Sequence, residues 1–229
     1  MKTNKGKSDK KELPQNHEIS SGIKAKDTIL LNNQRMESLI KILQYDSENV
    51  QLFLDYALNE AIKLTGSKIG YIYYYNEEKE EFTLNTWSKN VMKECSIANP
   101  QTCYQLANTG VWGEAVRQRK PIVLNDFQAS NPLKKGYPEG HAPLTKYLTV
   151  PVFSGKKIVA VVAVANKEAD YDQSDILQLT ILMDSVWKEV NRKKAEESLR
   201  QSEERFSMAY KTSPISFMIA NMEDGRIIE

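Results

Sequence analysis

The chain has 229 residues, 41% of them hydrophobic and 27% charged, which is enough for one domain of ordinary size with extensions. Its 31 basic and 30 acidic residues nearly cancel, so it has no overall basic field to attract nucleic acid or anionic lipid. The only two cysteines, Cys95 and Cys103, exclude a disulfide framework and suit a reducing cytoplasm.

Residues 1–27 are expected to form a disordered basic tail, because MKTNKGKSDKK has nothing apolar to bury. This tail also lacks the apolar segment of a signal peptide. The longest apolar run, Ile158–Ala165, is too short to cross a bilayer. We therefore expect a cytoplasmic segment without direct membrane insertion, which is compatible with a parent protein anchored to a membrane elsewhere.

Helical spacing of apolar residues predicts a first helix within residues 28–46. A second helix is predicted after Ser47, its expected N-cap, and Gly66 is expected to end it. Asp172 is expected to cap the last helix, with Asp175 placed to interact with the helix dipole.

Between these helices the pattern predicts strands, a short helix and two loops. The predicted strands are Ile69–Tyr75, Glu81–Ser88, Ile122–Leu124, Tyr147–Phe153 and Lys157–Ala165. A short helix is predicted over Val111–Arg119, both cysteines are placed in a loop before it, and Asp126–Thr145 is a long loop rich in Gly and Pro. This order predicts an α+β fold, an antiparallel sheet with helices on one side.

From about Gln51 to Trp187 the chain resembles a GAF domain, a small-molecule-sensing module of bacterial and archaeal signalling proteins. The stretches that carry the resemblance are LFLDYALNEAIKLTGSKIGYIYYYN, TGVWGEAVRQRKPIVLNDF, YLTVPVFSGKKIVAVVAVANK and DQSDILQLTILM. The resemblance implies a GAF-like central antiparallel β-sheet flanked by helices, with long N- and C-terminal signalling helices. Residues 47–188 are accordingly expected to form a GAF sensor domain.

The C-terminal part of the chain is expected to leave this domain as a helix. Residues 189–208 are predicted to be a linker or signalling helix, and residues 209–229 resemble the start of a PAS domain. Four residues of this helix follow one another at intervals of four, three and four positions: Ala195, Leu199, Ser202 and Phe206. This heptad-like spacing on one side of the helix, which we call the seam, is typical of a weak two-stranded coiled coil. A single solvated helix is the alternative.

Six residues are candidates for ligand binding: Trp87, Tyr104, Trp112, Asp126, Tyr137 and His141. Tyr137 and His141 belong to GYPEGHAP, and similar GAF domains often have such a loop with a histidine before the VPV strand. His141 is expected either to donate to a ligand or to hold the loop, while Asp126 either stabilises the loop through backbone hydrogen bonds or contacts a polar ligand.

The three aromatic candidates lie, with Tyr73 and Tyr75, near the region where the family has its pocket. Aromatic side chains bury large areas and recognise flat or cationic ligands. Tyr73 and Tyr75 are expected to lie in the core. Trp112 is expected either in the wall of the pocket or in the core, and the sequence favours neither.

Cys95 and Cys103 are candidates for a redox pair, the alternative being two inert thiols. Phytochrome-like GAF domains tether a bilin through a cysteine that often stands before a histidine, whereas here Cys103 precedes Tyr104, so no bilin is expected. No metal site is expected either, because two cysteines and one distant histidine leave a zinc tetrahedron incomplete.

Asn166, Lys167, Tyr171 and Asp175 loosely resemble the NKxFxxxDE pattern of cyclic-nucleotide-binding GAF domains. Tyr171 replaces the phenylalanine and Ile176 replaces the last acid. A structural corner, in which Lys167 and Asp175 tie the last strand to the last helix, is therefore favoured over cyclic-nucleotide binding, and the ligand stays unidentified.

The chain contains no Walker loop, GxSxG, HExxH or kinase signature, so no catalytic residue is expected in this segment. The resemblance implies the input domain of a two-component sensor histidine kinase in a phosphorelay. The expected partners are a second copy, bound through the N- and C-terminal helices, and downstream PAS and kinase domains of the same chain. The alternatives are an input domain of a diguanylate cyclase or transcription regulator, and a dimerisation scaffold that binds no ligand.

Overall fold

The computed structural model describes residues 29–212, apart from 31, 35, 48, 89–102 and 135–142, together with residue 226. The first helical segment, which we call the N-terminal helix, comprises the helical residues 29–30, 32–34 and 36–44. The elements that follow are α2 (Val50–Leu64), β1 (Ile69–Asn76), β2 (Glu81–Trp87), β3 (Cys103–Gln105), η1 (Leu106–Asn108), α4 (Val111–Arg117), β4 (Ile122–Leu124), β5 (Tyr147–Ser154), β6 (Lys157–Ala165) and α5 (Gln173–Thr212).

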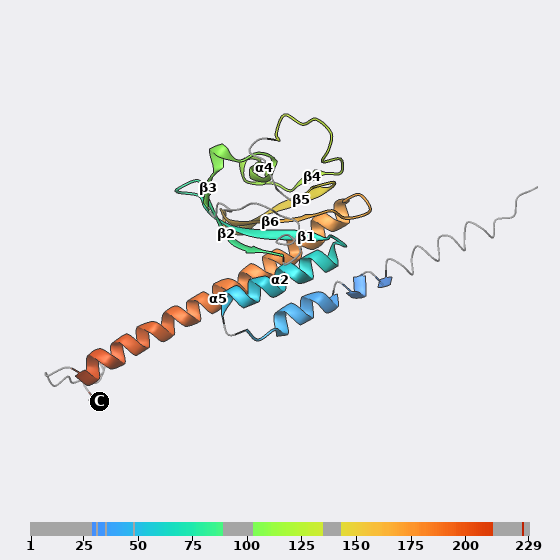
Figure 1. Cartoon of the computed structure of the whole chain (residues 1–229). Helices are drawn as coiled ribbons and strands as arrows, with labels where there is room; N and C mark the ends of the chain where they lie inside the picture. Colours follow the sequence, from blue (N-terminus) through green and yellow to red (C-terminus); the bar gives the residue numbers. More distant parts are fainter. Residues whose placement is uncertain are drawn as a thin grey trace, which may run out of the picture.

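The strands form one antiparallel sheet of six strands in the order β3-β2-β1-β6-β5-β4. This confirms the predicted α+β class with a central antiparallel sheet flanked by helices. Two expectations were wrong. Cys103 lies in strand β3, which pairs with β2, and not in a loop. The helices also cover both faces of the sheet, because α4 lies on the face opposite α2 and α5 (Figure 1).

The main core lies between the sheet and the pair α2 and α5. Alternate residues of a strand point to the same face, and on β6 Ala160, Val162 and Val164 are fully buried towards these helices. Gly70 in β1 allows α2 to pack closely, since a Cβ there would lie 3.1 Å from Ile62 Cγ1 and 3.2 Å from Leu58 Cδ1. The core therefore fixes α2 and α5 to one side of the sheet.

Helix α2 begins and ends with local signals that the sequence partly reveals. Its N-cap is Asn49, whose Oδ1 accepts from the Leu52 N–H at 2.9 Å, and not Ser47 as predicted. Ser47 Oγ is buried without a hydrogen-bond partner, too far back in the chain to serve as the cap. Gly66, at φ 62, follows the helix, and the Ser67 N–H donates to the Ile62 carbonyl at 2.9 Å in a Schellman motif. The predicted helix end is confirmed.

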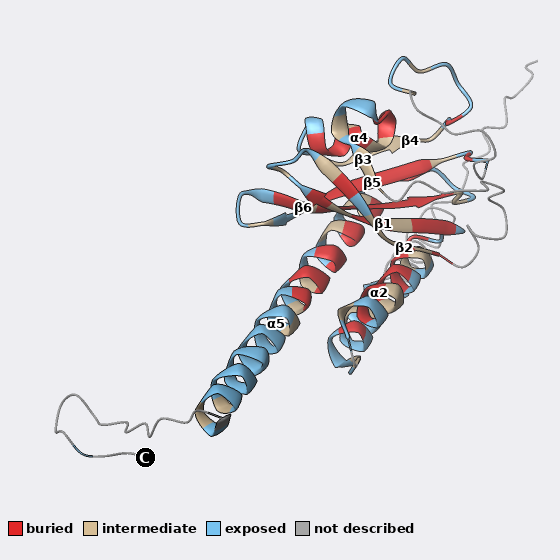
Figure 2. Ribbon diagram, turned by 60° about the vertical axis from the view of Figure 1, so that its left-hand side comes forward, coloured by how far each residue is buried: buried red, intermediate tan, exposed pale blue. Residues whose placement is uncertain are grey.

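Helix α5 begins with a reciprocal capping box. Asp172 Oδ1 accepts from the Asp175 N–H, and Asp175 Oδ2 accepts from the Asp172 N–H, both at 3.0 Å. The predicted cap is thus confirmed. The helix then runs unbroken for 40 residues to Thr212, past residue 208 where the linker helix was predicted to end. Its side chains pack on the sheet as far as Val190, and beyond that residue the helix is almost entirely exposed (Figure 2).

Two ion-pair clusters of the same design repeat along the exposed part of α5. Arg192 bridges Glu189 and Glu196, and eight residues later Arg200 bridges Glu197 and Glu204. Pairs spaced three and four residues apart stabilise a helix that has few tertiary contacts. Within the described ranges, none of the helices is both long and hydrophobic enough to cross a membrane.

Candidate functional site

An aromatic cluster covers the face of the sheet beneath α4. Its members are Tyr71, Tyr73, Tyr75, Phe82, Tyr104 and Trp112. Trp112 in α4 packs against Phe82 with ring centroids 4.8 Å apart, and against Tyr104 in an edge-on contact at 5.3 Å. Tyr73 and Tyr75 are 5% and 8% exposed, which confirms their predicted place in the core. Strands β1, β2 and β3 therefore meet α4 through aromatic rings.

Tyr71 of this cluster also meets a second tyrosine, Tyr147, across β6. The hydroxyl groups of Tyr71 in β1 and Tyr147 in β5 lie 2.6 Å apart. The residues of β6 opposite them are Ala163 and Ala165, whose small side chains leave room for the phenols above the strand. Burial raises the pKa of both phenols, and the neighbouring Tyr147 raises that of Tyr71 further. Both hydroxyls therefore stay protonated at physiological pH.

The phenol pair is surrounded by apolar side chains from several elements. Those most buried are Ile69, Val111, Phe127 and Leu144, and Trp87, Trp112, Ile122 and Leu124 pack against them. An apolar setting with a few converging polar groups is the usual composition of a small-molecule site. We call this region, together with the aromatic cluster, the α4 face.

Three of the sequence-predicted ligand residues come together on the α4 face. Trp87 and Trp112 pack against the residues around the phenol pair, and Tyr104 belongs to the aromatic cluster. Burial raises the pKa of Tyr73, an effect partly offset by its hydrogen bond with Trp87. Their proximity agrees with the prediction, and their contact with a ligand stays a prediction.

Asp126 lies elsewhere, exposed at the start of the loop after β4. Its Oδ1 accepts from the backbone N–H groups of Gln128 and Ala129 at 3.1 and 3.0 Å. These bonds are those of an Asx turn, the structural alternative considered for this residue. Tyr137 and His141, in the same loop, lie outside the described residues.

Tyr71 and Tyr147 were not among the predicted site residues. For Tyr71 a signal exists, since it occupies the same strand face as Tyr73 and Tyr75 by two-residue alternation. For Tyr147 the sequence offers only its position at the start of a strand, and its partner depends on which strands are neighbours.

The redox hypothesis involves one described residue, because Cys95 lies outside the described ranges. Cys103 is partly exposed in β3, and its pKa is raised, first by desolvation and then by the hydrogen bond and charge of Glu81. A raised pKa lowers the thiolate fraction and with it the rate of oxidation. Within the described residues, no group of three or more His, Cys, Asp or Glu side chains is arranged to hold a metal ion.

The corner between β6 and α5 contains the residues that resemble the nucleotide-binding pattern. Lys167 Nζ contacts Asp175 Oδ1 at 2.8 Å and Oδ2 at 2.6 Å. Asn166, at φ 63, accepts from the Thr145 N–H at 2.9 Å and donates to the Pro143 carbonyl at 2.9 Å. The ion pair joins β6 to α5, and the asparagine attaches the segment before β5 to the same corner.

Tyr171 at this corner should make stability depend on alkaline pH. Burial raises its pKa from 10.0 to about 12, although a hydrogen bond with Ser67 at 2.7 Å partly opposes the shift. Between these two values the folded state retains a proton that the unfolded state loses, so the free energy of unfolding should fall as pH rises, by about 1.4 kcal/mol per pH unit for this group. Denaturant titrations between about pH 9 and about pH 11 measure the slope. Tyr171→Phe should reduce it, and an unchanged slope would contradict the assignment.

A family model described as GAF domain matches residues 47–190, more than half of the chain, which therefore belongs to the GAF domain family. Among curated proteins it is similar to the methyl sulfide methyltransferase-associated sensor of Methanosarcina acetivorans, with 46% identity over 183 residues. The match covers 80% of this chain and 18% of that relative, so the chain spans about a fifth of the relative's length.

Solved structures show the same fold at low sequence identity. The GAF domain of a phosphoenolpyruvate-protein phosphotransferase from Acinetobacter has a TM-score of 0.57 at 18% identity, covering 72% of this chain and 95% of that chain. A free methionine-R-sulfoxide reductase from Neisseria meningitidis, solved with its substrate, has a TM-score of 0.57 at 16% identity, covering 74% and 93%. Identities this low support the fold and not a shared activity.

Proposed function

We propose that this chain is the ligand-sensing input domain of a larger signal-transduction protein, a two-component sensor histidine kinase. The observation that carries the proposal is the 40-residue helix α5, which packs on the sheet and then extends away from it. The relative that is 46% identical is named a sensor, and this chain corresponds to only 18% of its length, which supports a role as one module among several.

In this proposal a small molecule binds at the α4 face. Support comes from its aromatic walls, from the paired phenols of Tyr71 and Tyr147, and from the small residues Ala163 and Ala165 beneath them. Strand β5 carries Tyr147 on this face and contacts α5 through the other face. A ligand shifts the position of α5 only if it binds one arrangement more tightly than the other.

The output is assigned to other parts of the longer protein. A second copy pairs through the N-terminal helix and α5, and the segment from residue 209 leads into a PAS domain followed by a kinase. Phosphoryl transfer belongs to those domains, and this segment has no catalytic role. A diguanylate cyclase or a transcription regulator would use the same input in the same way.

A scaffold that binds no ligand is the second candidate, and one observation favours it. The hydroxyls of Tyr71 and Tyr147 are bonded to each other, and the rings of the aromatic cluster pack mostly against one another. Among the described residues, such a face has no unpaired buried polar side chain that a ligand must satisfy. In that case the domain would only hold the two α5 helices of a dimer in position.

Native mass spectrometry of the purified chain, compared with its denatured mass, distinguishes the two candidates. We expect a small-molecule mass that is lost on denaturation. Tyr71→Phe should weaken its binding about tenfold, because the variant removes a hydroxyl at the site. Tyr171→Phe, the same chemical change at the β6–α5 corner, is the matched control and should bind normally. A chain that carries no small molecule, either as purified or after incubation with cell extract, would favour the scaffold.

A further inference from the structure

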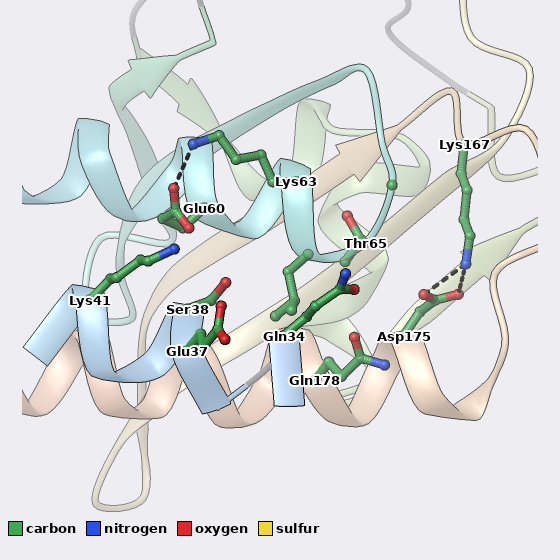
Figure 3. Close-up of a pocket in the computed structure, with 12 residues that line it drawn as sticks. Gln34, Glu37, Ser38, Lys41, Glu60, Lys63, Thr65, Lys167, Asp175 and Gln178 are labelled. Atoms are coloured by element: carbon green, nitrogen blue, oxygen red, sulfur yellow. Dashed lines mark hydrogen bonds and ion pairs between the residues drawn. The ribbon is translucent and has the colours of Figure 1, made fainter. Parts of the chain in front are cut away.

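A polar groove of about 530 Å³ lies on the other side of the sheet from the α4 face, where three helices meet (Figure 3). Its walls are the N-terminal helix, the end of α2 and the corner between β6 and α5. The volume is that of a small organic molecule, within the usual range for ligand sites. Apart from Leu64 and Gly66, its lining residues have polar or charged side chains, so its chemistry differs from that of the α4 face.

One wall presents polar side chains that have no partner within the part of the chain that the structure describes. On the N-terminal helix, residues spaced by helical turns face the groove: Gln34, Glu37, Ser38 and Lys41. None of these side chains forms a hydrogen bond or ion pair with any described residue. Glu37 and Lys41 are one turn apart and carry opposite charges, so this wall offers a carboxylate and an ammonium group side by side.

The facing wall holds its charges in pairs. Glu60, with a side chain 7% exposed, pairs with Lys63 at 2.7 Å, and Asp175, 6% exposed, pairs with Lys167 at 2.6 Å. The lining residues therefore include three lysines and three carboxylates. A ligand with a single charge would be attracted by one set and repelled by the other, whereas a zwitterion can satisfy both.

A buried amide at the base of the groove is a further observation in favour of a polar occupant. Gln178 is 9% exposed, and its Oε1 is buried without a hydrogen-bond partner. Its Nε2 donates to Ser174 Oγ at 2.9 Å. If the amide were rotated by 180°, the serine hydroxyl would donate to Oε1 and Nε2 would be left without a partner, so one atom of the amide is unpaired in either orientation. Figure 3 shows this side chain rising from α5 between Gln34 and Asp175. An unpaired buried amide is costly, which favours an occupant that bonds to it.

We propose that this groove binds a compact zwitterion of the amino-acid class. Its carboxylate pairs with Lys41, its ammonium group with Glu37, and a polar side chain bonds to the amide of Gln178. The ligand contacts the N-terminal helix and the first turns of α5 together, so its binding holds these two helices in one arrangement. This site is independent of the proposed ligand site on the α4 face.

The test is a titration of the full chain with each standard amino acid, by thermal shift and then by calorimetry. At least one polar amino acid should raise the melting temperature and bind in a saturable way. Gln178→Leu should weaken that binding about tenfold or more. The variant should keep its fold, because it replaces an unpartnered amide with an apolar side chain of similar size. Gln201→Leu, the same change on the exposed end of α5, is the matched control and should bind like the parent chain.

Two results would overturn the proposal. One is that no amino acid binds to the parent chain. The other is that an amino acid binds but Gln178→Leu and Lys41→Glu bind it unchanged. If Tyr71→Phe alone weakened that binding, the molecule would be a ligand of the α4 face. Failure at the groove thus leaves the proposed sensing function to be judged separately by native mass spectrometry.

Discussion

Replacing Phe82 with alanine is expected to lower the free energy of unfolding by about 3–5 kcal/mol. Phe82 is fully buried at the centre of the aromatic cluster, with ring centroids 4.7 Å from Tyr75 and 4.8 Å from Trp112. The cavity would lie between the sheet and α4, where rigid rings on both sides collapse poorly. Denaturant unfolding followed by circular dichroism measures the loss.

Phe153→Ala is the matched control for this prediction. Phe153 lies near the β5–β6 turn, 37% exposed, with Arg119 over its ring at 5.3 Å. The same truncation there should cost less than about 1.5 kcal/mol, since it leaves no closed cavity. Similar losses at the two positions would show that the aromatic cluster is not a packed core.

The second large effect is expected on assembly. Leu199 and Phe206 are 61% and 65% exposed on α5 and lie seven residues apart, on the predicted coiled-coil seam. Two further apolar residues, Leu177 and Ile181, are 60% and 46% exposed in the part of α5 that packs on the sheet. In a dimer, Leu199→Glu with Phe206→Glu would bring like charges together and remove buried apolar area. The dissociation constant should rise at least about a hundredfold.

Sedimentation equilibrium over a range of concentrations measures this change. Gln201→Glu is the control, because it adds a negative charge to the same helix outside the seam and should leave the dimer intact. A parent chain that stays monomeric at every concentration would rule out pairing through α5. The single solvated helix, supported by the ion pairs of Arg192 and Arg200, would then be the correct description.

The sheet was largely predictable because its longer strands have strong local signals. The bounds of β4 and β6 match the prediction, since both are runs of mostly apolar, β-branched residues next to turns at Gln118–Arg119 and Gly155. Strand β3 was missed because three residues are too few to show alternation, and it exists only through pairing with β2. The helix on the opposite face of the sheet was not predicted to lie there, because α4 is short and its sequence does not show which face of the sheet it packs against.

The candidate sites depended more on tertiary structure. Trp87, Tyr104 and Trp112 could be grouped because the resemblance to GAF domains places them near one pocket region, although Tyr104 lies on the strand that was not predicted. The bond between Tyr71 and Tyr147 could not be predicted, since it requires β6 to lie between β1 and β5. The groove was also hidden, because its walls come from three helices whose packing the helical pattern does not specify.

The two Glu–Arg–Glu clusters on α5 determine what kind of motion the helix can carry. A helix stiffened by such ion pairs moves as a rigid rod, and the first part of this one, up to Val190, is packed on the sheet. Its exposed arm, residues 191–212, is about 33 Å long at 1.5 Å per residue. A tilt of about 10° at Val190 would therefore displace the far end by about 6 Å, roughly one helical turn. Small adjustments in the packing of β5 would be converted into much larger displacements of the far end of α5.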